Sequence, residues 1–314
     1  MQPRSLGGGI VPPVAELPGA STAASRRGAI YTLLAAFAAA IYVIAFRSAR
    51  DVPRESFVLA VLVIAAAANL LWLFIRTNPR ILGHLPRHEG WIAAALALCT
   101  AAANYCVARA SQTLDGGAIA ALFQTEIFFV AAAAWLALGE RPSARVAAGA
   151  AVATLGVVIA RAPGSDAAWD PVGVAWALAA SVAFALLLVI TRGAAHRIHL
   201  ERVNAYRLLA AAPLALVLPG ALREIGGLGP GAWVLAAVAA VAGPVVSRLL
   251  QMYAVRELTA VQVKLGLLTT AVFAYGLEAV IFQRFPAGIE IAGALFILAG
   301  VAASRLRWPA GRPS

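Results

Sequence analysis

The sequence predicts an all-α polytopic membrane protein of ten transmembrane helices, arranged as two inverted repeats of five. Three observations lead to this fold class. Of 314 residues, 62% are hydrophobic and only 12% are charged, which is too few polar side chains for a water-soluble surface. Apolar runs of about 20 residues, the length that crosses a bilayer, recur along the chain. The second half also repeats features of the first half at a constant offset.

The apolar runs divide the chain into two units between polar tails. Residues 1–27 are rich in Gly, Pro and Ser and lack the apolar core of a secretory signal, so we expect a disordered tail. The runs of the first unit are 28–46, 56–75, 91–108, 117–138 and 146–160. The runs of the second unit are 172–190, 203–222, 232–253, 259–282 and 289–303. The expected domains are the tail at 1–27, repeats at 28–161 and 172–305, and a short tail at 306–314.

Basic residues between the runs orient the protein. With an even number of spans both termini lie on one side, and that side carries sixteen Arg residues, Arg207 counted among them, against seven on the other side. Because basic residues are retained on the cytoplasmic side, both termini are predicted to be cytoplasmic, in the inner membrane. The net charge of +11 is thereby explained by membrane topology, without a nucleic-acid partner. The other two basic residues, Arg248 and Lys264, fall inside predicted spans.

A shift of 144 residues superimposes the two halves without a gap. The matched pairs include Thr125 with Thr269, Pro142 with Pro286, Gly149 with Gly293 and Gly156 with Gly300. Each half holds five spans, an odd number, so the second half is predicted to be inserted upside down. Inverted repeats of this kind place a solute site near the midplane, between the halves.

The fourth and fifth runs carry a recognisable motif. The fourth run ends in Gly139, Glu140, Arg141 and Pro142, and glycines recur in the fifth. Residues 118–161 resemble the EamA-type repeat of the drug/metabolite transporter superfamily, and residues 260–305 resemble it too. The resemblance implies ten helices around a central cavity, with small metabolites as the usual cargo and export as the usual direction. The second copy departs from the motif at 283–285, so we interpret Glu140 and Arg141 as structural residues that cap and pair at the membrane face.

Three ionisable residues stand out most clearly inside predicted spans, where charged side chains usually face a bundle interior or a wet cavity. Glu126 is expected near the midplane, and Lys264 and Arg248 in the cytoplasmic half. Glu126 and Lys264 are placed to form a pair, which could simply lock helices together. The functional alternative is a solute site of net charge near +1, suited to a carboxylate-bearing or zwitterionic metabolite. Glu126 could instead carry a coupling proton, because a carboxyl group shielded from water readily takes up a proton.

Neutral polar residues in the same spans are candidates for substrate binding, and an interhelical hydrogen bond is an equal alternative for each. They are Asn104, Tyr105, Gln124, Gln262 and Tyr275. The ninth span is expected to be one continuous helix, and spacings of seven, four and three residues place four of its side chains on one stripe. They are Lys264, Ala271, Tyr275 and Glu278. Gly243 and Pro244 interrupt the eighth span, and they predict a kink there, either a hinge or a static bend.

The predicted function is a secondary transporter, an exporter of a small polar or amphipathic metabolite, that acts by alternating access as a monomer or loose homodimer. A flippase for a lipid-linked substrate is an alternative on the same fold. An intramembrane enzyme is disfavoured because the chain has no HExxH or GxSxG motif, and no soluble domain supports a sensor. No cofactor is expected. The histidines, His84, His88, His196 and His199, are interpreted as interfacial loop residues rather than metal ligands.

Overall fold

The structure is a computed structural model of the whole chain, and its described part is all helical. It describes residues 22–49, 51–76, 85–110, 113, 122–123, 125–161, 170–218, 220–283 and 288–305. Within these ranges six helical stretches are long and apolar enough to cross a membrane, and three shorter apolar helices accompany them. Two of the six, Pro230–Glu257 and Ala260–Ile281, consist of consecutive shorter helices. An α-helix satisfies its own backbone hydrogen bonds, which is why apolar spans in lipid adopt it. The all-helical membrane fold is therefore confirmed, while ten crossings and an inverted second repeat stay predictions.

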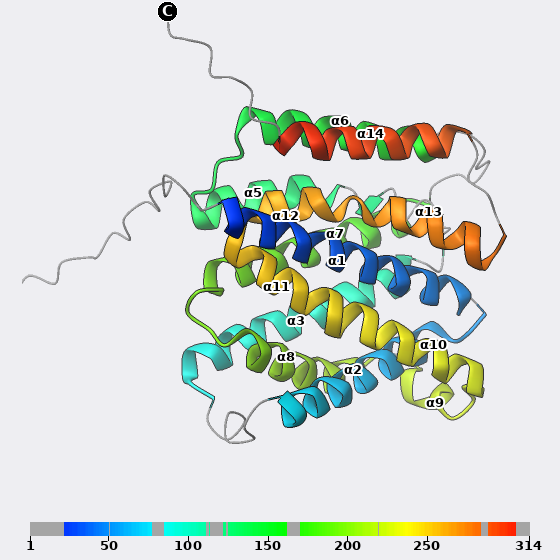
Figure 1. The fold of residues 1–314 in the computed structure, drawn as a ribbon. Coiled ribbons are helices and arrows are strands. Elements are labelled where there is room, and N and C mark those ends of the chain that lie inside the picture. Colours follow the sequence, from blue (N-terminus) through cyan, green and yellow to red (C-terminus); the bar gives the residue numbers. More distant parts are fainter. Residues whose placement is uncertain are drawn as a thin grey trace, which may run out of the picture.

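The helices run along one common direction in Figure 1. In the first half they are α1 (Thr22–Ser48), α2 (Arg54–Arg76), α3 (Arg87–Ala110), α5 (Glu126–Leu138) and α6 (Ala144–Arg161). In the second half they are α7 (Pro171–Ala194), α8 (Leu200–Ala215), α9 (Ala221–Ile225), α10 (Pro230–Ala240), the π-helix η2 (Val241–Ser247), α11 (Arg248–Glu257), α12 (Ala260–Leu267), α13 (Thr270–Ile281) and α14 (Gly288–Arg305). The predicted span at 203–222 ends early, because α8 stops two residues after Pro213.

Helices α6 and α14 form an outer layer at the top of Figure 1, and they pack on each other more than on the rest of the bundle. Glycines allow this close approach. A Cβ atom at Gly156 would lie 2.6 Å from the carbonyl oxygen of Gly293, and one at Gly300 would lie 2.4 Å from that of Gly149. Small residues at a helix crossing let the backbones meet, as is common between membrane helices. The four glycines of the two matched pairs therefore meet at one helix crossing, where each pair packs against the other.

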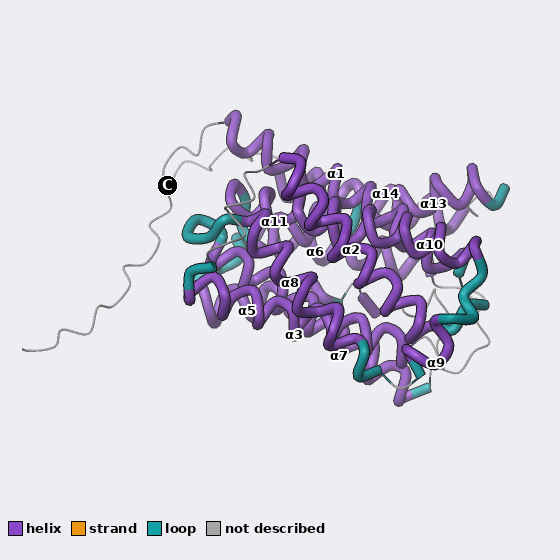
Figure 2. Tube along the Cα trace, turned by 90° about the horizontal axis from the view of Figure 1, so that it is seen from below, coloured by secondary structure: helices purple, strands orange, loops and turns teal. Residues whose placement is uncertain are grey.

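Helix ends follow local sequence signals. Asp170 caps α7 by accepting a hydrogen bond from the Gly173 N–H at 2.8 Å, and Pro171 occupies the first helical position. Helix α5 ends at Gly139, whose φ of 68° is the left-handed conformation that glycine adopts readily. Gly139, the first residue of the EamA-like motif at the end of the fourth run, is thus a helix C-cap. Viewed from below, the helices remain packed as one bundle (Figure 2).

Predicted spans in both halves contain turns inside the bundle. The span at 259–282 breaks at Leu268 and Thr269 into α12 and α13, so the predicted stripe from Lys264 to Glu278 does not run along one continuous helix. The Thr269 hydroxyl donates to the Gly266 carbonyl at 2.7 Å. Its repeat partner Thr125 lies in a turn before α5 and donates to the Leu122 carbonyl at 2.6 Å. The two halves therefore interrupt their helices at matched threonines.

Candidate functional site

The expected pairing of Glu126 with Lys264 is confirmed, and it joins the two halves at the interrupted helices. Lys264 Nζ lies 2.6 Å from Glu126 Oε2, and the two side chains are only 10% and 13% exposed. Glu126 begins α5, and Lys264 lies in the last turn of α12. An acidic residue at a helix N-terminus and a basic residue at a C-terminus each match the helix dipole. Interrupted helices whose ends carry such groups form solute and ion sites in transporters.

Arg248 lies near this pair but bonds to other groups. It begins α11 directly after the π-helix. Its Nη2 donates to the Leu187 carbonyl at 2.6 Å and to the Thr191 hydroxyl at 2.8 Å, and its Nη1 donates to Gln251. Arg248 also interacts electrostatically with Glu126. The three charged residues singled out in the sequence therefore lie in one region, although Arg248 forms no direct ion pair with Glu126 in the described part of the chain.

Arg207 is a central residue that the sequence did not reveal. Counting it among the flanking basic residues is wrong, because it lies about two turns inside α8 and is 2% exposed. Its guanidinium donates to Asn204 Oδ1 at 2.8 Å, to the Thr100 hydroxyl at 2.8 Å and to the Pro244 carbonyl at 2.9 Å. The sequence did hold a signal for its burial. Arg207 lies inside the predicted span that begins at 203, and it shares a helix face with the polar Asn204 three residues before it.

Pro244 gives this region an unusual backbone. It lies in the π-helix η2, so the regular α-helix is interrupted at Gly243 and Pro244, while a hinge or a static bend there stays a prediction. Proline has no backbone N–H, and its ring disturbs the preceding turn, so a regular α-helix is interrupted there. π-helical turns occur frequently at functional sites. The carbonyl of Pro244 accepts its bond from Arg207, so the irregular backbone is part of the same polar network.

Of the neutral candidates in α3, Asn104 lies at this network, whereas Tyr105 packs on α7. Asn104 is buried, donates to the Thr100 carbonyl at 2.8 Å and faces the hydroxyl of Tyr42 at 3.5 Å. Tyr105 packs edge to face on Trp176, with ring centroids 5.6 Å apart. We call Thr100, Asn104, Asn204, Arg207 and Arg248 the central cluster.

Two further neutral candidates are described, one in α12 and one in α13. Gln262 forms a capping box with Thr259 at the start of α12, so its side chain serves the helix end rather than the interior. This Thr-x-x-Gln signal was present in the sequence. Tyr275 is buried in α13, beyond the break after α12. Gln124 lies outside the described residues.

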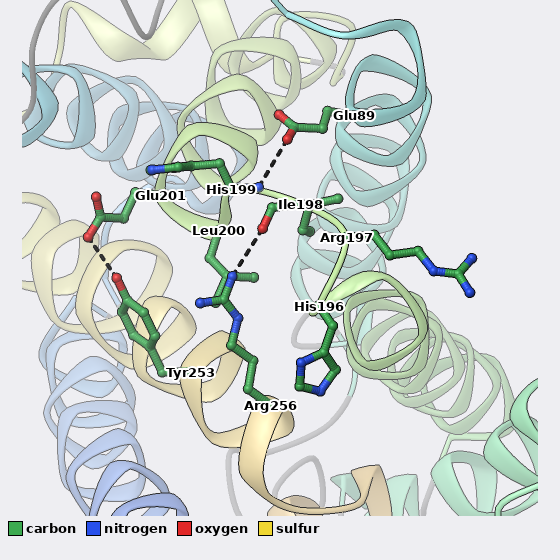
Figure 3. Close-up of a pocket in the computed structure, with 9 residues that line it drawn as sticks. All are labelled: Glu89, His196, Arg197, Ile198, His199, Leu200, Glu201, Tyr253 and Arg256. Carbon is green, nitrogen blue, oxygen red and sulfur yellow. Dashed lines mark hydrogen bonds between the residues drawn. The ribbon is translucent and has the colours of Figure 1, made fainter. Parts of the chain in front are cut away.

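A second polar region lies at the loop between α7 and α8, residues 195–199. It borders a pocket of about 370 Å³, shown in Figure 3. The pocket is lined by Glu89, His196, Arg197, Ile198, His199, Leu200, Glu201, Tyr253 and Arg256. Arg256 donates to the carbonyls of Ala195 and Ile198, and the Tyr253 hydroxyl donates to Glu201 at 2.7 Å. The groups around this pocket therefore already bond to one another.

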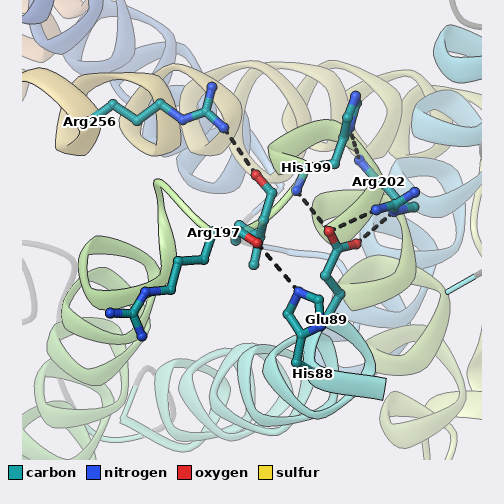
Figure 4. Close-up of polar contacts among 7 residues, drawn as sticks. His88, Glu89, Arg197, His199, Arg202 and Arg256 are labelled. Atoms are coloured by element: carbon teal, nitrogen blue, oxygen red, sulfur yellow. Dashed lines mark hydrogen bonds and ion pairs between the residues drawn. The ribbon is translucent and has the colours of Figure 1, made fainter. Parts of the chain in front are cut away.

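The strongest contact at this loop is between α3 and α8. Glu89 accepts two hydrogen bonds from Arg202, at 2.6 and 2.7 Å, and a third from the His199 N–H at 3.0 Å (Figure 4). Beside it, His88 Nε2 lies 3.4 Å from the Arg197 carbonyl. Among the described residues, no group of three His, Cys, Asp or Glu side chains could hold a metal ion. His84 lies outside the described residues. Because these polar groups are used to hold the α7–α8 loop in place, we interpret the region as structural.

Glu140 also pairs at this end of the bundle, as the interpretation of the motif expected. Its Oε1 lies 2.6 Å from Arg192 Nε, and its Oε2 accepts from the Ala260 N–H at 3.3 Å. Arg192 extends the contact to the Val255 carbonyl. The motif at the end of α5 thus connects the first half to three helices of the second. Arg141 is exposed and lines a shallow surface pocket with Trp135.

Comparisons with known proteins agree with this description. The sequence profile described as the EamA-like transporter family matches residues 26–162 and again residues 171–306. A search of curated proteins gave no match. One solved crystal structure resembles the fold with a TM-score of 0.72 at 19% sequence identity, over 90% of this chain and 96% of its own. At that identity the likeness concerns the fold alone.

Proposed function

Because the chain belongs to the EamA-like transporter family, we propose that it exports a small polar or amphipathic metabolite across the cytoplasmic membrane. In this proposal ten helices cross the membrane as two inverted repeats, at 28–161 and 172–305, with both termini in the cytoplasm. The solute binds between the repeats and is released by alternating access as the repeats rock against each other. No nucleotide-binding motif is present in the sequence, so an ion gradient supplies the energy, and a proton carried by Glu126 is the candidate.

The observation that carries the proposal is the ion pair between Glu126 and Lys264. It connects one interrupted helix of each half, inside the bundle, at positions where charged side chains are expensive to keep. An ion pair that spans both halves breaks when the halves separate, so its energy depends on the conformation. Such a contact is suited to a solute or proton that replaces one partner during the cycle.

Metabolite profiling of the medium tests the proposal. Cells that express the intact chain are compared with cells that express Glu126→Gln or Lys264→Ala at equal membrane levels. We expect a compound to accumulate outside only with the intact protein, and to be lost in both variants. Glu224→Gln and Arg223→Ala, both in the exposed short helix α9, are the matched controls and should export normally. An unchanged medium would contradict export, and a headgroup-selective change in the lipid leaflets would indicate lipid flipping instead.

A further inference from the structure

The central cluster holds a buried positive charge whose partners are all neutral. Arg207 donates to an amide oxygen, a hydroxyl group and a backbone carbonyl. No ion pair among the described residues includes Arg207 or Arg248. A charge held away from water is costly unless an opposite charge lies beside it. The cluster therefore lacks the component that normally accompanies a buried guanidinium.

Two donors of the cluster have no partner at all. Asn204 Nδ2 and Arg248 Nε are both buried and without a hydrogen bond. Asn204 is fully buried and Arg248 is 9% exposed, so bulk water does not satisfy these groups. Buried polar groups in folded proteins are nearly always bonded, and exceptions call for a water, an ion or a ligand. Both unsatisfied atoms are donors, and donors require an acceptor such as an anionic oxygen.

The charges of the region do not balance. The carboxylate of Glu126 pairs with Lys264 and also acts electrostatically on Arg248. With Arg207 included, three positive groups therefore share one negative charge. Arg207 bonds to the Pro244 carbonyl, and Arg248 begins α11 one turn after Pro244, so both residues adjoin the same irregular turn. A bound dianion would neutralise both groups and accept bonds from the unsatisfied donors.

We propose that Arg207, Asn204 and Arg248 form an anion-binding subsite, and that the exported solute is an organic dianion with carboxylate groups. This inference rests on the proposed transport function and specifies its substrate class. A guanidinium group binds a carboxylate through two parallel hydrogen bonds, which gives both strength and orientation. The donors are shielded from solvent in the described conformation, so the anion enters when the halves open. A phosphate ester carries the same charge, and the test below separates the two.

Thermal unfolding of the purified intact protein in detergent tests the subsite without any transport step. Unfolding is followed with a thiol-reactive dye, because Cys106 is buried and Cys99 is partly buried in the folded protein. The probes are succinate, inorganic phosphate and neutral succinamide, each at an ionic strength matched with sodium chloride. A ligand that binds only the folded protein raises its Tm. We expect succinate to raise the Tm by several degrees, and succinamide and chloride to leave it unchanged.

Three variants locate the effect. Arg207→Lys keeps the charge but loses the planar guanidinium group. We expect that roughly ten times more succinate is then needed for the same rise in Tm. Asn204→Asp supplies an internal carboxylate beside Arg207, so it should raise the Tm without ligand and abolish the succinate response. Arg248→Gln should also reduce the response, and it guards against a fold defect at Arg207. The matched control, Arg223→Lys in the exposed helix α9, should respond like the intact protein.

Each result decides the inference. No succinate effect beyond chloride, or an effect that Asn204→Asp leaves intact, overturns it. An effect of phosphate alone overturns the carboxylate class. The proposed export stands or falls separately, because it is measured in cells. If succinate binds at Arg207 and nothing is exported, export is wrong and the subsite stands; if a neutral metabolite is exported and succinate does not bind, only the subsite is wrong.

Discussion

At the α7–α8 end of the bundle Glu89 and Glu140 each pair with a guanidinium group, whereas in the interior Arg207 and Arg248 hydrogen-bond only to neutral groups. Glu89 receives two bonds from Arg202 and one from a backbone N–H, so its oxygens are well satisfied. In the central cluster the charge is positive, and two donors are left over. The same residue type, arginine, is thus used in two physical situations within one molecule.

The difference separates structural charges from functional ones. In a complete ion pair each charge is already neutralised, so no ligand is required, and the pair holds a loop in one conformation. An incomplete cluster in a low-dielectric interior is expensive to maintain, and proteins retain such clusters where a ligand completes them. Glu126 and Lys264 stand between these cases, since they form a complete pair that spans the two halves. The comparison therefore predicts how removal of a charge affects stability in each region.

The largest effect is expected for Glu89→Gln. Glutamine cannot balance Arg202, which is 17% exposed and would be left without a charge partner. Breaking such a pair costs about 3 kcal/mol, so the Tm of the purified protein should fall clearly. The double variant Glu89→Gln with Arg202→Met should recover much of the loss, because it also removes the unpaired charge. Equal Tm values for the single and double variants would show that the pair does not hold this end together.

A double-mutant cycle on Glu126 and Lys264 should give the next largest effect. We expect Glu126→Gln and Lys264→Met each to destabilise the protein, and the two together to cost less than their sum. The coupling energy should be about 1–3 kcal/mol, the range for residues in direct contact. The thermal measurement is repeated with the exposed pair Arg223→Gln and Glu224→Gln, which should be additive. Additive effects at Glu126 and Lys264 would mean that their contact contributes little and that each charge is stabilised by its own helix end.

Much of the fold followed from composition, because lipid allows little besides helices for an apolar chain. The 144-residue shift matched Thr125 with Thr269, and the two make the same kind of hydrogen bond. The contact between Glu126 and Lys264 was predicted from two opposite charges inside spans. These features are encoded by periodicity and position along a span, which a sequence displays directly.

What the sequence did not reveal depends on tertiary contacts. Arg207 stands close to other arginines near the start of a span, so it looked like a flanking residue, yet α8 begins early enough to bury it. The break between α12 and α13 also escaped, because Leu268 and Thr269 are compatible with a continuous helix. The packing of neighbouring helices decides whether such an arginine is buried and whether such a segment continues a helix or forms a turn.

A glycine substitution separates packing at the central cluster from its charge. A Cβ atom at Gly243 would lie 2.4 Å from the ring of Tyr42, whose hydroxyl faces Asn104. Gly243→Ala should therefore displace the ring and destabilise the protein by about 1 kcal/mol. Gly276→Ala in α13 is the control, because no atom lies within 4 Å of the added carbon, and it should be neutral or slightly stabilising. Equal behaviour of the two variants would show that Tyr42 moves aside without cost.

The smallest effect is expected at the exposed start of α7, the opposite end of that helix from the paired charges. The Gly173 N–H donates to the Asp170 carboxylate and lowers the pKa of Asp170 below its usual value of about 3.9. A lowered pKa in the folded state means that the stabilisation is present above the usual value and is lost as the pH falls through the folded pKa. Unfolding of the intact protein and of Asp170→Asn, compared from neutral to acidic pH, should show a small advantage for the intact protein that disappears in acid. A difference that stays constant with pH would assign the cap to hydrogen bonding alone, with no contribution from charge at the helix dipole.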